Sequence, residues 1–154
     1  MDSTQRTRSP HVKLQEFMDC YLETDYEKEL ENFSQPKVMG SIREEAPDEA
    51  LRYLALVLLY ALEERVEDIS FIRKSAYQWH CTMTGEKSYD VPPAEAEVMS
   101  AMLEEIKGMV GIDETKRKSK LIVGLKNDQL DLTITSSVTR SGEESIVIHL
   151  PPLA

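Results

Sequence analysis

Histidine and cysteine are the residue types in this sequence that most often bind metals or attack substrates, and few of them are placed to act together. His80 and Cys81 are neighbours, but adjacent residues of a strand point to opposite faces, so they cannot ligate one ion. His11 and His149 have no partners at the spacing of a metal site. The sequence therefore predicts a surface histidine beside a core cysteine, with no metal ion and no other cofactor.

A cysteine nucleophile would need the Cys81 thiol to be exposed beside a base. The segment YQWHCTM alternates apolar and polar residues, which is typical of a half-buried antiparallel strand. This alternation turns Cys81 inward together with Tyr77, Trp79 and Met83. We therefore predict an inert thiol in the core.

Acid–base and nucleotide chemistry are also disfavoured. Asp131 and His80 would form an acid–base pair only if their strands adjoin, and such a pair is more often a surface hydrogen bond. The chain contains no G-x-x-x-x-G-K-[ST] motif, the loop whose backbone cradles nucleotide phosphates. We expect no catalytic residues and a protein that is not an enzyme.

The composition is that of a soluble, acidic, single-domain protein. The 154 residues are 41% hydrophobic, which is enough for one core. Eighteen Lys and Arg stand against 28 Asp and Glu, a net charge of −10, and this argues against nucleic acid because phosphate binding needs a basic surface. The longest apolar stretch, Tyr53–Leu62, is ten residues, while a membrane span needs about 20. With no signal-peptide pattern and two cysteines, we expect a cytoplasmic protein without membrane insertion.

The N-terminal part is predicted to be a tail followed by an acidic amphipathic helix and a linker, over residues 1–9 and 10–46. The tail is polar without periodicity and is expected to be disordered. From His11 to Phe33, apolar residues recur at helical spacing, and they form the stripe Leu14, Phe17, Met18, Tyr21 and Leu22. The stripe fits either a helix docked on its own domain, which we favour, or a helix that enters a groove of a partner.

Residues 47–150 are predicted to form one α+β unit, followed by a short tail at 151–154. A helix from Pro47 to about Arg65 is apolar nearly all round and should be buried against a sheet. Strands follow in DISFIR and YQWHCTM, Pro92-Pro93 opens a second helix that Gly111 ends, and KLIVGL, QLDLTITS and ESIVIHL are the last strands. The expected fold is two helices on one face of a mostly antiparallel sheet of about five strands, plus the N-terminal helix.

This ordered set resembles the second N-terminal domain, a PAS-like module, of the type II secretion and type IV pilus assembly ATPases. The matching pieces are ALEERVEDISF, the strand ending at Gly85, EIKGMVGID, and the pair QLDLTITS and SGEESIVIHL. Asp131-Leu132 and Gly142-Glu143 stand at the family's aspartate-leucine step and glycine-glutamate turn. The resemblance spans residues 47–150 and implies a free-standing, degenerate relative that lacks the motor domain.

In that family, arginines of this module reach the phosphates of a neighbouring motor domain. The resemblance places those positions at His80, Thr82 and Thr133 of this sequence, and none is an arginine. Threonine cannot supply the charged planar fork that stabilises a phosphoryl transition state, and histidine is only partly charged near neutral pH. The resemblance therefore implies a scaffold without its catalytic contribution.

We expect a non-enzymatic protein-interaction or regulatory module that contacts its partner through the polar side of the sheet and the N-terminal stripe. The polar side is made of Gln78, His80, Thr82, Asp131, Thr133 and Thr135. In the family the equivalent surface meets a neighbouring subunit, so the partner would be a protein, for example a secretion or pilus motor ATPase or a second copy of this chain.

Two other interpretations remain open. A PAS-like sensor would hold a small ligand, which requires an apolar pocket with a few convergent polar groups. An enzyme of unrecognised type ranks last. The basic run Lys116, Arg117, Lys118 and Lys120 fits a solvated connection better than a docking site for an acidic surface.

Overall fold

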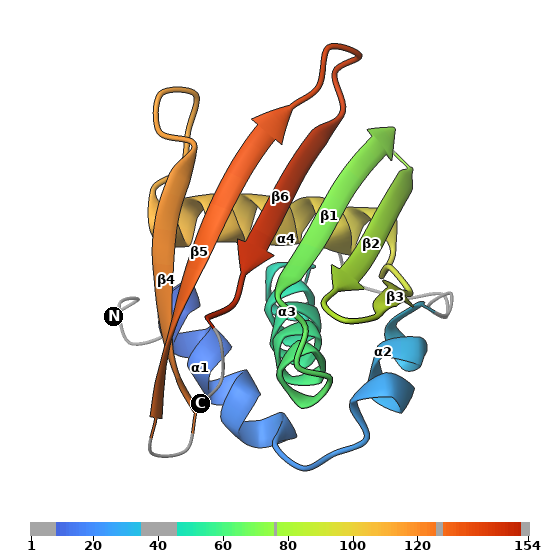
Figure 1. Cartoon of the computed structure of the whole chain (residues 1–154), viewed down its shortest axis with the longest axis vertical. Coiled ribbons are helices and arrows are strands. Elements are labelled where there is room, and N and C mark those ends of the chain that lie inside the picture. The colour runs from blue at the N-terminus through green and yellow to red at the C-terminus, as the bar shows by residue number, and fades with distance from the viewer. Residues whose placement is uncertain (1–8, 35–45, 76, 126–127, 152–154) are drawn as a thin grey trace, which may run out of the picture.

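The computed structural model describes residues 9–34, 46–75, 77–125 and 128–151 of the chain (Figure 1). Within these residues the helices are α1 (Pro10–Tyr21), α2 (Tyr26–Ser34), α3 (Ala46–Glu63) and α4 (Ala96–Val110). The strands are β1 (Asp68–Ser75), β2 (Gln78–Thr84), β3 (Ser88–Val91), β4 (Lys118–Leu125), β5 (Asp128–Val138) and β6 (Glu144–His149). The predicted tails, the linker before Pro47 and the turn at 126–127 lie wholly or mostly outside the described residues.

The strands form one six-stranded sheet in the order β3-β2-β1-β6-β5-β4, and every neighbouring pair is antiparallel. The α+β class is therefore confirmed. The structure has one strand more than the five expected, because the sequence pattern did not indicate β3. This strand is only four residues long and returns beside β2 after the turn at Gly85, whose N–H bonds to the carbonyl of Lys87 at 2.9 Å.

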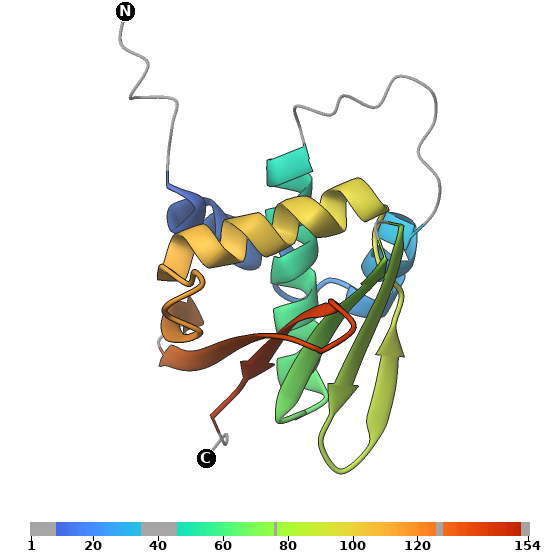
Figure 2. The same ribbon diagram turned by 90° about the horizontal axis from the view of Figure 1, so that it is seen from above.

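Helix α3 is the centre of the core, as its apolar sequence predicts. Its buried residues point in all directions, and α1, α2 and α4 all contact it. Figure 2 shows α1 and α4 on one side of the sheet, with α3 running from that side toward the strands. The core cluster joins α3 to inward side chains of the strands, among them Phe71, Met83, Leu132 and Ile148.

The predicted helix over residues 11–33 is two helices in the structure. The chain turns between α1 and α2 at Glu23, whose φ of 66° lies in the left-handed region. Asp25 then accepts the N–H of Lys28 at 3.1 Å and so caps the start of α2. Neither glycine nor proline marks this turn, which is why the periodicity continued through it.

The stripe of α1 faces α3 and not a partner. Leu14 and Met18 are buried in the core, and Phe17, Tyr21 and Leu22 pack against it. Lys13 of α1 also forms an ion pair with Asp48 of α3, with 3.0 Å between Nζ and Oδ1. The structure therefore has the arrangement that the sequence favours, a helix docked on its own domain, and in this arrangement Leu14 and Met18 are not accessible to another protein.

Strand β2 begins one residue later than the alternation suggests. Tyr77 was expected to point inward but is 89% exposed, because it lies in the turn before β2. The pairing of β1 with β2 shifts between Arg73 and Ser75, which places the irregularity at this turn. Trp79, Cys81 and Met83 do point into the core as predicted.

Gly111 ends α4 as predicted. Its φ of 72° is left-handed, and its N–H bonds to the carbonyl of Lys107 at 2.9 Å. Among the described helices, none is both long enough and apolar enough to span a bilayer.

Candidate functional site

The face of the sheet opposite the helices, called the outer face below, is the candidate site. No described helix covers it, and it is turned toward the viewer in Figure 1. All six predicted contact residues lie on it, because each alternates along its strand with a core residue. Those of β2 are Gln78, His80 and Thr82, and those of β5 are Asp131, Thr133 and Thr135.

The two groups of three are not adjacent. Strands β1 and β6 lie between β2 and β5, so the groups are separated by about 14 Å, three strand spacings. His80 and Asp131 therefore cannot form the acid–base pair that adjoining strands would have allowed. The predicted contact residues therefore share one face of the sheet but form two separate groups on it, one on β2 and one on β5.

A different acid–base pair lies between them. Nδ1 of His149 on β6 is 2.8 Å from Oδ1 of Asp68 on β1, because these residues are directly paired in the sheet. Thr133 stands opposite His149 on β5, and Lys120 stands opposite Thr133 on β4. Sequence reasoning missed this polar row, since positions 68 and 149 are neighbours only through the order of the strands.

The His149–Asp68 pair lacks the surroundings of a catalytic dyad. Their side chains are 55% and 41% exposed, so bulk water screens the pair. Among the described residues, no hydroxyl or thiol hydrogen-bonds to the free side of the imidazole, as a nucleophile in a triad would. The contact joins β6 to β1 across the outer face.

Cys81 is a core thiol, as predicted. Burial raises its pKa to about 12, and the hydroxyl of Tyr53 lies 3.8 Å from its sulfur. That hydroxyl also donates to the carbonyl of Pro92 at 2.8 Å, and burial raises the pKa of Tyr53 well above its usual value. Neither group ionises near neutral pH, so this pair contributes packing and no chemistry.

Three His, Cys, Asp or Glu side chains never come together in the described part of the chain as a metal site would require. Charged residues gather instead at one end of the sheet, where Glu144 of β6 lies 2.9 Å from Lys107 of α4 and 3.5 Å from Arg73 of β1. The hydrogen bond from Lys107, with the charge of Arg73, lowers the pKa of Glu144. The guanidinium of Arg73 also lies 5.7 Å from the ring centre of Trp79. This network ties α4 to three strands.

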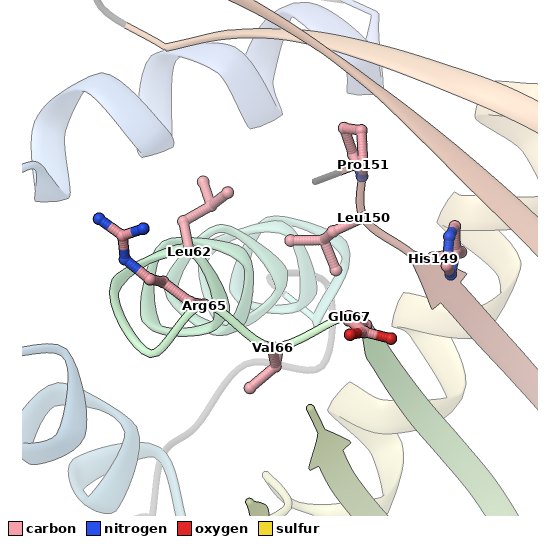
Figure 3. Close-up of a pocket in the computed structure, with 7 residues that line it drawn as sticks. All are labelled: Leu62, Arg65, Val66, Glu67, His149, Leu150 and Pro151. Carbon is pink, nitrogen blue, oxygen red and sulfur yellow. The ribbon is translucent and has the colours of Figure 1, made fainter. Parts of the chain in front are cut away.

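A pocket of about 370 Å³ opens where α3 ends and β6 leaves the sheet (Figure 3). Leu62 and Leu150 point toward its centre from opposite sides, and Glu67 and His149 lie at one rim. Arg65, Val66 and Pro151 complete the lining. The pocket lies at the end of the sheet and not between the helix layer and the sheet, where side chains such as Tyr53, Phe71 and Met83 are fully buried.

No protein-family model matches this chain, and a search of curated proteins finds no match either. The resemblance to the secretion-ATPase domain therefore depends on the sequence motifs alone.

Proposed function

We propose that this chain is a protein-interaction or regulatory module related to the second N-terminal domain of secretion and pilus ATPases, and that it works without catalysing a reaction. The observation that carries the proposal is the outer face, a six-stranded surface that no described helix covers. A sheet face of this kind either stays solvated or receives another molecule. Thr82, Asp131 and Thr133 on this face are short and polar, as is typical of the solvent-accessible rim of an interface.

The resemblance supplies the kind of partner. The three positions that correspond to the family's phosphate-reaching arginines, His80, Thr82 and Thr133, all lie on the outer face. A domain that faced a motor subunit with neutral side chains at these positions would bind the subunit without stabilising its transition state. The partner proposed here is thus a motor ATPase or a second copy of this chain.

The proposal is tested by placing charge on the outer face. Because His80 is exposed and Thr133 is half-buried on that face, His80→Glu and Thr133→Glu should leave the melting temperature nearly unchanged. We expect both variants to recover much less motor ATPase than the wild type in affinity capture with quantitative mass spectrometry. Cys20→Ser, a change to an exposed residue of α1, is the control and should capture as the wild type does. Equal capture by all four proteins would contradict the proposal, as would turnover of a nucleoside triphosphate by the purified chain.

The pocket in Figure 3 favours a second candidate, a sensor of a small ligand. Its volume of about 370 Å³ is sufficient for a metabolite, and apolar Leu62 and Leu150 lie beside ionisable groups. A panel of metabolites tested by thermal shift would identify such a ligand, since a compound that binds only the folded state raises the melting temperature. Leu150→Trp should fill the pocket and abolish that shift.

A further inference from the structure

Strand β4 is the last strand of the sheet and pairs, among the described strands, only with β5. The N–H and C=O of Gly124 both bond to the side chain of Gln15, so they point away from β5. In an antiparallel strand the N–H and C=O of one residue point to the same side, and alternate residues share that side. The backbone groups of Ile122, Lys120 and Lys118 therefore also point to the outer edge.

Helix α1 closes one half of this edge. The amide of Gln15 donates to the carbonyl of Gly124 at 2.8 Å and accepts its N–H at 2.7 Å, as a neighbouring strand would. The imidazole of His11 bonds to the carbonyl of Ile122. Beyond that point, no described residue hydrogen-bonds to the edge side of Lys120 or Lys118. Within the part of the chain that the structure describes, the first half of β4 is thus an open strand edge.

The open half of the edge is basic, although the whole chain carries a net charge of −10. Arg117, Lys118 and Lys120 are exposed, and within the described residues none of them has an ion pair. Lys118, Lys120 and Ile122 alternate along β4 onto the outer face, and Ile122 is 45% exposed. Lysines on an edge strand normally discourage pairing with other strands. They favour it when the incoming strand is acidic.

We propose that the open edge of β4 binds an extended acidic segment of a partner protein, which adds to the sheet as a further strand. Backbone hydrogen bonds to Lys118 and Lys120 would hold the segment, and acidic side chains at alternate positions would lie beside the two ammonium groups. An apolar side chain of the segment, two residues beyond the acidic residue beside Lys120, would cover Ile122. The basic run 116–120 is then part of a binding site and not only a solvated connection.

Other occupants fit the edge less well. A second copy paired through β4 would bring its own lysines beside these lysines, and like charges at opposite positions of a sheet are destabilising. A nucleic acid would use the ammonium groups but leave the strand's N–H and C=O groups unused, and the charge of the chain would repel it. An acidic strand satisfies both the backbone and the charge.

The test uses the full chain and a fluorescent peptide of alternating valine and glutamate, with binding measured by anisotropy. One control peptide has lysine in place of glutamate. The other keeps the glutamates but carries N-methyl groups on the backbone, so it cannot add as a strand. We expect the first peptide to bind and both controls to bind at least about tenfold more weakly, a difference of roughly 1.4 kcal/mol. Equal binding of the N-methylated peptide would overturn the proposal, because charge alone would then suffice.

Three protein variants separate the contribution of charge from that of the backbone. Lys120→Pro and Lys120→Gln both remove the ammonium group, but only proline removes the N–H at the open edge, and it leaves the bonds to β5 in place. We expect weaker peptide binding by the proline variant than by the glutamine variant. The double variant Lys118→Glu/Lys120→Glu should reverse the preference and bind the lysine peptide, which keeps the proposal testable if the proline variant does not fold.

Three outcomes would contradict the inference. The first is peptide binding that is equal for the proline and glutamine variants. The second is an unchanged peptide preference in the double variant. The third is self-association of the wild type that Lys120→Pro abolishes. The inference does not depend on the proposed function. His80→Glu, on a distant strand of the outer face, should leave peptide binding unchanged even if it prevents capture of a motor ATPase.

Discussion

At the scale of single residues, Arg65 occupies a position that favours glycine. It follows α3 with a φ of 57°, and the N–H of Val66 bonds back to the carbonyl of Ala61 at 3.1 Å, closing the helix. Gly111 does the same after α4 with a φ of 72°. An L-residue in this conformation carries a cost that glycine avoids. The residue at this position is nevertheless an arginine, and the side chain of Arg65 lines the pocket in Figure 3.

Replacing Arg65 with glycine should therefore stabilise the fold. We expect Arg65→Gly to raise the free energy of unfolding by about 1 kcal/mol in urea denaturation. Arg65→Ala keeps the strain and should give no gain, while Gly111→Ala should lower the free energy of unfolding by a similar amount. Destabilisation by Arg65→Gly would mean that the guanidinium makes a stabilising contact larger than the backbone cost.

The two cysteines should differ strongly in reactivity. The buried Cys81 has its pKa raised to about 12, whereas Cys20 is exposed on α1. Because the thiolate is the reactive form, an aromatic disulfide reagent at pH 8 should titrate one thiol in the native protein and two in guanidinium. The Cys20→Ser variant should show no rapid reaction at all. Rapid reaction of that variant would contradict the burial of Cys81.

At the scale of secondary-structure elements, Gln15 joins α1 to the edge of β4. Gln15→Ala removes both bonds to the backbone of Gly124 and should destabilise the protein by about 1–2 kcal/mol. Amide exchange at Gly124 should become faster, because its N–H then faces water. The control is Gln129→Ala, which loses only an exposed bond of 3.2 Å to Asp131. Equal effects of the two substitutions would show that the two bonds between Gln15 and Gly124 do not stabilise the strand edge.

The network at Glu144 predicts a dependence on pH. The bond from Lys107 lowers the pKa of Glu144 in the folded state, so the ionised carboxylate stabilises the fold above the unfolded pKa of about 4.3. This stability is lost as the pH falls through the lower, folded pKa. Glu144→Gln should thus lower the free energy of unfolding at pH 7 by no more than about 1 kcal/mol, since the pair is partly exposed.

The difference between wild type and Glu144→Gln should shrink as the pH is lowered below about 4. The neighbouring substitution Glu143→Gln is the matched control, because that carboxylate lies 4.0 Å from its partner Lys74. We expect the control to differ little from the wild type throughout. A penalty for Glu144→Gln that stays constant from pH 7 to pH 3 would contradict the ionic origin of the effect.

Element types were predictable from the sequence where the local pattern was strong. The apolar run of α3 and the alternation in β2 and β5 led to the correct structures because burial follows directly from the pattern. The sequence did not indicate β3, because four residues are too few to show the alternation of a strand. It did not indicate the turn at Glu23 either, because no glycine lies there. The His149–Asp68 pair was out of reach, since only the pairing of β1 with β6 brings these residues together.

At the scale of the whole molecule, the N-terminal helices and the remainder share one core. Leu14 and Met18 of α1 and Tyr26 and Leu30 of α2 belong to the same buried cluster as α3 and the sheet. The ring of Phe33 also meets that of Tyr53 edge-on, with 5.9 Å between their centres. Helix α3 is apolar all round because it is enclosed by α1 and α2 as well as by the sheet and α4.

A fragment of residues 46–154 should therefore fail to fold as a stable unit, although the sheet and two helices are complete in it. Losing four buried side chains removes roughly 6–12 kcal/mol, at about 1.5–3 kcal/mol each, which equals most of the stability of a typical domain. We expect circular dichroism without a cooperative thermal transition and collapsed amide dispersion in NMR. In the full chain, Leu14→Ala should cost about 2–5 kcal/mol while Val12→Ala, on the exposed side of α1, costs less than about 0.5 kcal/mol. A fragment that melts cooperatively near the temperature of the full chain would show that α1 and α2 are an appended segment, and their apolar side chains would then be free to bind a partner.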